Sequence, residues 1–385
     1  MPTPTVDLHV PGLAHLHRRR SDKWAGHAPD VLVSTIAEMD FPLAPPVAAA
    51  LHAAIERHDL GYTPHDPAAL REALAGFAAR RLGWQVDRDQ VTLVPDVMVG
   101  LIELCRVLVA PGDVVAFATP AYPPFFSELP QAGVRIREVP TRPDGALELE
   151  QLDAVLTDGA RALVLANPHN PSGHVLPRAE LEEIAERCAD HDTWVLADEV
   201  HAPLVLPGAA HTPWLEVSDA ARGRGIALTS ASKAFNLAGL KAALLVTGSE
   251  RARAAVARLP PLTDRAGLLG VVAAEAAFVE GDPWLDAVLA RLDANRALLG
   301  ERLAAELPDV RWTPPEASYL AWLDCRALGL GDNPAATFWA RGRVALSAGV
   351  NYGRQGAGHV RLNFGTSPEL VAEAVDRMAS VAAHR

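Results

Sequence analysis

From residue 67 onward, short continuous apolar runs alternate with longer segments in which apolar residues recur at helical spacing. The apolar runs predict strands at residues 90–94, 113–120, 161–168, 193–200 and 225–230. The segments of helical period predict helices at residues 67–84, 97–112, 147–156 and 178–191. This alternation indicates an α/β fold with a parallel or mostly parallel sheet between layers of helices. In such folds the ligand site lies at the carboxyl ends of the strands.

The pattern changes after about residue 285. A predicted helix at residues 292–307 is followed by the alternating segment "HVRLNFG" and by a final helix that we expect to be capped at Ser367, with Pro368 in its first turn. We therefore expect a large domain at residues 46–285 and a smaller α+β domain at residues 286–385. The Pro- and His-rich residues 1–45 predict an arm that packs on the small domain or on a partner subunit.

Composition narrows the class of protein. The net charge of -12 disfavours a nucleic-acid or anionic-membrane surface, and the basic run at residues 17–20 is too short to reverse that. Cys105, Cys188 and Cys325 are widely spaced, which predicts buried free thiols rather than zinc ligands or a disulfide framework. No signal peptide pattern or membrane-length apolar run is present, so we expect a cytoplasmic protein. Because no Cys or His ligand spacing is present either, we expect no bound metal.

Unusual side chains follow the predicted strands. "LANPHNPSG" places Asn170 in a turn, where asparagine also serves as a plain turn former, and "ATPAYPPF" places Tyr122 at another strand end. "VLADEVH" ends an apolar strand with Asp198, a carboxylate that is costly to bury unless it meets a cation or a donor. "LVPDVMVGL" begins a helix whose first amides, near Val97 and Met98, can hold an anion.

The stretch "LTSASKAFNLAGLK" adds two lysines in a setting that is poor in acidic residues. A desolvated Lys233 would have a lowered pKa and would form a Schiff base readily with an aldehyde. A phosphate would explain Ser230, Ser232 and Lys241, while a cationic ring nitrogen would explain Asp198. Pyridoxal phosphate (PLP) combines these features, and we expect it as the cofactor.

The strings "NPHNPSG", "ADEVH", "SASKAFNLAGLK" and "VRLNFG" resemble the fold-type I aminotransferase superfamily. "SDKW", "AEMDFPLAPPV", "GYTPHDPAALREAL", "TPAYPPF" and "DEVHAPLV" resemble its MalY/PatB branch of cystathionine or cysteine-S-conjugate β-lyases. The resemblance runs from about residue 20 to the C-terminus. It implies a large domain with a mostly parallel seven-stranded sheet, followed by a small α+β domain.

The resemblance also implies roles for individual residues. Lys233 would hold the cofactor and remove the substrate α-proton, and Asp198 would keep the ring nitrogen protonated. Asn170 would bind the ring phenolic oxygen, near His201, and would also contact the substrate. Tyr122 would stack on the ring and assist proton transfer.

Further positions follow from the same resemblance. The phosphate would be bound by Val97, Met98, Ser230, Ser232 and Lys241. Tyr62 would reach the phosphate of a neighbouring subunit, which implies a homodimer with shared active sites. Arg361 would grip the substrate carboxylate, and the alternation in "HVRLNFG" supports a polar strand face there, although an exposed edge-strand arginine is the alternative.

The expected reaction is β-elimination of a thiol from L-cystathionine or another cysteine S-conjugate. An aminotransferase is the alternative, because the cofactor motifs serve both reactions. A specialised eliminase or oxidase of secondary metabolism, and a protein-binding regulator on the same fold, are further alternatives. The sequence departs from the branch pattern at Ala317, Ser318, Ala348, Asn351 and Tyr352, which leaves the natural substrate open.

Overall fold

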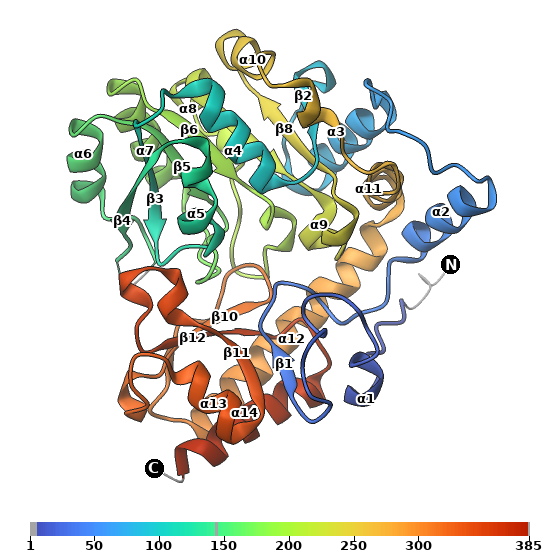
Figure 1. Ribbon diagram of the computed structural model, residues 1–385, viewed down its shortest axis with the longest axis vertical. Helices are drawn as coiled ribbons and strands as arrows, with labels where there is room; N and C mark the ends of the chain where they lie inside the picture. The colour runs from blue at the N-terminus through green and yellow to red at the C-terminus, as the bar shows by residue number, and fades with distance from the viewer. Residues whose placement is uncertain (1–5, 143–144, 384–385) are drawn as a thin grey trace.

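The computed structural model describes residues 6–142 and 145–383. In Figure 1 a large α/β domain lies above a smaller domain, and the long helix α12 (Asp282–Glu306) runs from one to the other. This helix begins well before residue 292, where the sequence analysis placed its start, because Pro283 occupies its first turn and initiates it there.

Within the described residues, the large sheet has seven strands in the order β2-β8-β7-β6-β5-β3-β4. The strands are β2 (Val91–Val94), β3 (Val114–Thr119), β4 (Arg135–Pro140), β5 (Ala160–Ala166), β6 (Trp194–Asp198), β7 (Gly225–Thr229) and β8 (Ala243–Thr247). In this part of the chain both pairings of β8 are antiparallel, and the other pairings in the sheet are parallel. The mostly parallel seven-stranded sheet is therefore confirmed.

Alternate residues of the central strands enter two separate apolar cores. Leu196 and Leu228 belong to the core that includes Leu101 of α4, whereas Val195 and Ala227 belong to the core on the opposite face. Because both faces are buried, these strands have continuous apolar sequences. The helices of this domain are α2 (Pro45–Glu56), α3 (Ala68–Leu82), α4 (Val97–Leu108), α5 (Pro124–Ser127), α6 (Leu149–Thr157), α7 (Arg178–Asp190), α8 (Asp219–Arg224), α9 (Ala231–Ala234), α10 (Glu250–Val256) and α11 (Leu268–Glu280).

The small domain contains a second sheet, with the strand order β1-β11-β12-β10-β9 over the described ranges. Its strands are β1 (Leu32–Ser34), β9 (Arg311–Trp312), β10 (Leu320–Asp324), β11 (Val344–Ala348) and β12 (His359–Asn363). Its helices, besides α12, are α1 (Leu13–Leu16), α13 (Pro334–Gly342) and α14 (Pro368–Ala383).

The N-terminal segment contributes to this second sheet, since β1 pairs in parallel with β11. The chain then passes through residues 35–40 to α2 of the large domain, so these residues cross between the two domains. We call residues 35–40 the crossing segment. At the other end of the chain, the Ser367 hydroxyl accepts from the Leu370 amide at 3.3 Å, which confirms the expected cap of α14.

Candidate active site

A cavity of about 670 Å³ lies at the carboxyl ends of β3, β5, β6 and β7, and residues of β11 and β12 also line it. Neighbouring parallel strands bring together side chains that are far apart in sequence. The sequence-predicted residues that line the cavity are Val97, Met98, Tyr122, Asn170, Asp198, His201, Ser230, Ser232, Lys233, Lys241 and Arg361. Tyr62 is the predicted residue that does not line it.

Lys233 lies in α9, directly after β7, and its ammonium faces the cavity. Its Nζ donates to the Ala37 carbonyl at 3.1 Å and makes no ion pair within residues 6–142 and 145–383. Burial, assisted by the positive charge of Arg361, lowers the pKa of Lys233 to about 8. A neutral, nucleophilic amine is therefore accessible near neutral pH.

Asp198 is the last residue of β6 and is buried. Burial raises its pKa to about 6, an effect that is opposed by the hydrogen bond from the Val200 amide at 3.2 Å and by the charge of Lys233. The described residues provide no ion-pair partner for it, so a cationic group in the cavity would stabilise its charged form.

Arg361 lies on β12, between β11 and β10, and only 4% of its surface is exposed. Its guanidinium donates to Asn170 Oδ1 and to the Thr35 carbonyl, each at 2.9 Å, and lies over the Tyr352 ring at 5.3 Å from the centroid. Its Nε has no hydrogen-bond partner in the described part of the chain. The alternative of an exposed edge-strand arginine is therefore wrong, and the buried fork of donors suits a carboxylate ligand.

His201 and Tyr122 complete the polar lining near the strand ends. Burial, together with the charges of Lys233 and Arg361, lowers the pKa of His201 to about 3, so the imidazole is neutral. Its Nδ1 has no partner among the described residues. Burial raises the pKa of Tyr122 to about 12, so the phenol keeps its proton at neutral pH.

The start of α4 and the residues after β7 form another part of the cavity lining. Asp96 caps α4 by accepting from the Val99 amide at 2.8 Å, and its other oxygen pairs with Lys241 Nζ, also at 2.8 Å. The Ser230 hydroxyl donates to the Ala242 carbonyl at 2.7 Å and accepts from the Ser232 amide. The phosphate-binding roles of Val97, Met98, Ser230, Ser232 and Lys241 stay predictions.

Sequence reasoning missed Asp96 as a cavity residue, although an aspartate directly before a helix is a recognisable N-cap signal. It also missed the crossing segment, of which Ile36 and Ala37 line the cavity. No side-chain pattern could reveal this contribution, because Ala37 acts through its backbone carbonyl, which accepts from both Lys233 and Tyr319.

Three of the five departures from the branch pattern line the cavity: Ala348, Asn351 and Tyr352. Tyr352 also accepts from the Ala121 amide through its carbonyl at 2.9 Å, which ties the small domain to the loop that carries Tyr122. Ala317 and Ser318 are buried and do not line it.

Tyr62 lies in the connection between α2 and α3, outside the cavity, and is 94% exposed. Leu43, Ile55, Leu60 and Leu262 are further large apolar side chains that are exposed. An aromatic ring this exposed has no role in the core of its own chain.

Among the described residues, no group of three or more His, Cys, Asp or Glu side chains is arranged to hold a metal ion. The described helices include none that is long and apolar enough to cross a membrane.

The family model described as "Aminotransferase class I and II" matches residues 34–378, and the chain belongs to this family. Within it, the chain belongs to the MalY/PatB branch. A Mycobacterium tuberculosis protein named "Putative cystathionine beta-lyase" is 42% identical over 98% of this chain and 98% of that protein. "Cystathionine beta-lyase PatB" of Bacillus subtilis is 34% identical over 91% of this chain and 92% of that protein.

A solved structure from Corynebacterium diphtheriae shares the fold along almost the whole chain. It is named a "putative plp-dependent beta-cystathionase" and is 35% identical, with a TM-score of 0.92 over 98% of this chain and 100% of that one. The expected superfamily and branch are thus confirmed.

Proposed function

We propose that this chain is a PLP-dependent carbon–sulfur β-lyase that cleaves L-cystathionine or a related cysteine S-conjugate to a thiol, pyruvate and ammonia. The observation that carries the proposal is one cavity lined by a buried lysine of lowered pKa, a buried carboxylate without an ion-pair partner and a buried arginine fork. The names of the PatB and Corynebacterium relatives support the lyase reaction over others on this fold.

The residues of the cavity fit PLP. Asp198 offers a carboxylate that lacks a cation, and His201 has a buried nitrogen without a partner in the described ranges. Lys233 would hold the cofactor covalently, Asn170 and Tyr122 would contact its ring, and the start of α4 with Ser230, Ser232 and Lys241 would hold its phosphate. When bound, PLP supplies an electron-accepting ring that stabilises negative charge developing at the substrate α-carbon.

The side chains of this protein then position the substrate and move its protons. Arg361 binds the α-carboxylate through its guanidinium, whose orientation is fixed by Asn170 and by the Thr35 carbonyl. Lys233, with a pKa of about 8, accepts the α-proton and can then donate a proton to the leaving thiolate. Tyr122 keeps its phenolic proton at neutral pH and can assist proton transfer. The thiolate leaves from the β-carbon, and addition of one water accounts for the pyruvate and ammonia.

The test of this function is release of pyruvate and ammonia from L-cystathionine by the purified, PLP-loaded protein, with no keto acid added. Multi-turnover release of both products in equal amounts is expected. Absence of release from L-cystathionine and from simple S-alkyl cysteines, with amino-group transfer to an added keto acid, would contradict the lyase proposal and identify an aminotransferase.

We further propose that the active form is a homodimer in the cytoplasm. The almost fully exposed Tyr62 and the exposed apolar side chains Leu43, Ile55, Leu60 and Leu262 support a subunit contact that covers them. The free, buried Cys105, Cys188 and Cys325 suit a reducing compartment. Sedimentation of the wild-type protein and of Tyr62→Phe would test the dimer and the phosphate role separately, since Tyr62→Phe should remain dimeric but bind PLP more weakly.

A further inference from the structure

A fully buried ion pair lies beside the active site without lining it. Lys23 and Asp40 are each 1% exposed, and Lys23 Nζ lies 2.8 Å from Asp40 Oδ2. Trp24 Nε1 donates to the other carboxylate oxygen at 2.9 Å. The Arg19 guanidinium donates to the Asp40 carbonyl at 2.8 Å and lies 3.5 Å from the same carboxylate oxygen, as a second and more exposed ion pair. Such a pair is expensive to desolvate and is weak evidence for a gain in folding stability. Its presence here, with several further hydrogen bonds, therefore suggests a role other than stabilising the fold.

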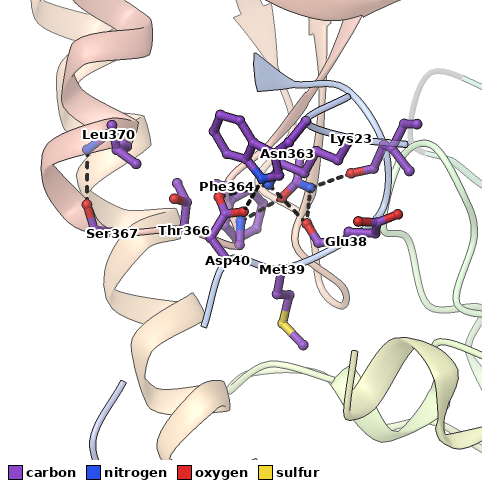
Figure 2. Close-up of polar contacts among 12 residues, drawn as sticks. Lys23, Glu38, Met39, Asp40, Asn363, Phe364, Thr366, Ser367 and Leu370 are labelled. Atoms are coloured by element: carbon purple, nitrogen blue, oxygen red, sulfur yellow. Dashed lines mark hydrogen bonds and ion pairs between the residues drawn. The ribbon is translucent and has the colours of Figure 1, made fainter. Parts of the chain in front are cut away.

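Asp40 is the last residue of the crossing segment, and Lys23 also donates to the Glu38 carbonyl at 3.1 Å. Figure 2 shows Lys23, Asp40 and Asn363 close together around Glu38. The Asp40 amide donates to the Gly365 carbonyl at 2.8 Å. The ion pair therefore ties one end of the crossing segment to the N-terminal segment at Lys23, while the Asp40 amide ties the same end to Gly365, just after β12.

Side chains of both domains hold the rest of the crossing segment by its backbone. From the large domain, Asn236 contacts the amide and the carbonyl of Met39, each at 2.8 Å. From the small domain, the Asn363 amide group donates to the carbonyls of Ile36 and Glu38 at 2.6 and 2.8 Å.

Two backbone carbonyls of the crossing segment contact the residues with proposed catalytic and substrate-binding roles. The Ala37 carbonyl accepts from Lys233 Nζ at 3.1 Å, and the Thr35 carbonyl accepts from the Arg361 guanidinium at 2.9 Å. A shift of the segment would move both acceptors together. The network thus connects a buried charge pair to Lys233 and Arg361 of the cavity through three to five residues of backbone.

We infer that Lys23 and Asp40 are positioning residues for the active site. Their ion pair holds the crossing segment so that its carbonyls orient Arg361 for the substrate carboxylate and Lys233 for the α-carbon. This inference rests on the roles given to Arg361 and Lys233 in the proposed function. Neither Lys23 nor Asp40 touches the substrate, so their effect is transmitted through the backbone.

The test compares Lys23→Met with Asp30→Asn as a matched control. Asp30 lies on the same N-terminal segment and pairs with Arg343 at the start of β11, at 2.7 and 2.9 Å, but the pair is exposed and outside the cavity. Four quantities are measured for each PLP-loaded variant: the KM for L-cystathionine, the kcat, the pH at which the cofactor absorbance changes, and the melting temperature. Hydrogen–deuterium exchange of residues 35–40 is measured on the cofactor-free protein.

Lys23→Met should raise KM about 10-fold. The Thr35 carbonyl would no longer be held where it accepts the charge-assisted hydrogen bond from Arg361, so Arg361 would be less well oriented for the substrate carboxylate. It should also speed exchange of residues 35–40 about 10-fold and shift the absorbance titration, while kcat falls less than KM rises. Asp30→Asn should change KM, kcat and the exchange rate by less than about twofold, because exposed ion pairs contribute little to stability.

A lower melting temperature with unchanged KM, titration and exchange would overturn the inference and make the pair purely structural. Should Lys23→Met fail to fold, Trp24→Phe removes only the indole donor to Asp40, and the same readouts should move about threefold in the same direction. If the wild-type protein released no pyruvate, the proposed function would fail, whereas the exchange and absorbance measurements would still decide the positioning role.

Discussion

Lys23 and Lys233 donate to backbone carbonyls of the same crossing segment at the same distance, 3.1 Å, yet their surroundings differ. Lys23 also has the Asp40 carboxylate at 2.8 Å and is sealed from solvent. Lys233 faces the cavity and has no such partner in the described residues, and Asp198 nearby has none either. Lys23 therefore has a carboxylate partner within its own chain. Lys233 and Asp198 have no such partner among the described residues, and both face the cavity in which a ligand would bind.

This difference shows how one segment serves structure and chemistry together. A satisfied pair such as Lys23–Asp40 fixes the backbone, because loss of Asp40 would leave the buried Lys23 without its carboxylate, and loss of Lys23 would leave Asp40 with only the Arg19 guanidinium at 3.5 Å. An unsatisfied pair of groups has perturbed pKa values, which are useful for moving protons and binding a cofactor.

The largest effect is expected from Lys233→Ala. Removing the amine should abolish the absorbance of the covalently held cofactor and lower kcat for pyruvate release by at least about 10³-fold, because the general base is lost. Absorbance spectra and steady-state kinetics of the PLP-loaded variant check this. Retention of most of the activity would refute the assignment of the site.

Asp198→Asn should change how stability depends on pH. The pKa of Asp198 is raised in the folded state to about 6, so its contribution to stability is complete below its unfolded pKa of 3.8 and is lost as pH rises through 6. In cofactor-free protein, the free energy of unfolding of wild type relative to Asp198→Asn should fall by about 3 kcal/mol between pH 3.5 and 7.5.

Denaturant titrations of both proteins across this pH range provide the measurement. Saturation with PLP should reduce the difference, because a protonated ring nitrogen would stabilise the charged carboxylate. If the free energy of unfolding had the same pH dependence in both cofactor-free proteins, the pKa of Asp198 would not be raised by folding.

Arg361→Lys tests whether the buried fork binds the substrate carboxylate. Lysine keeps the charge but cannot donate two parallel hydrogen bonds, so KM should rise about 30-fold with a smaller change in kcat. Steady-state kinetics with L-cystathionine measure both constants. A large fall in kcat with an unchanged KM would point to a role in the chemical step instead.

The smallest effect is expected from Lys241→Ala. The Lys241 side chain is 59% exposed and is already paired with Asp96, so its loss should weaken PLP binding about 10-fold without altering kcat at saturating cofactor. Equilibrium titration with PLP measures the dissociation constant. An unchanged constant would remove Lys241 from the phosphate site.

Much of the large domain could be predicted because its strands are continuous apolar runs. The strands that carry Tyr122, Asn170 and Asp198 at their ends were predicted, and the parallel-sheet rule then placed those residues in one cavity. β4 and β8 were not predicted. β4 lies at a sheet edge and alternates charged and apolar residues, so it lacks a continuous apolar run. β8 begins directly after the lysine motif, separated from it only by one short turn, so it was not recognised as a separate element.

The contacts between distant segments could not be predicted in the same way. Asn170 and Arg361 are 191 residues apart, and Lys233 and Ala37 are 196 apart. The string "SDKW" shows nothing of the burial of Lys23, because its partner Asp40 comes from a separate string, "AEMDF", and the two meet only in the folded chain. Side-chain type suggested the catalytic groups, while the backbone acceptors that orient them required the structure.

The most direct test of the contrast between the two lysines uses the fact that the sequence contains only Lys23, Lys233 and Lys241. The PLP-loaded protein is reduced with borohydride, digested, and examined by mass spectrometry to locate the lysine that carries the cofactor. We predict stoichiometric modification of Lys233, with Lys23 and Lys241 unmodified. Modification of Lys23 or Lys241 in place of Lys233, or of no lysine at all, would contradict the account.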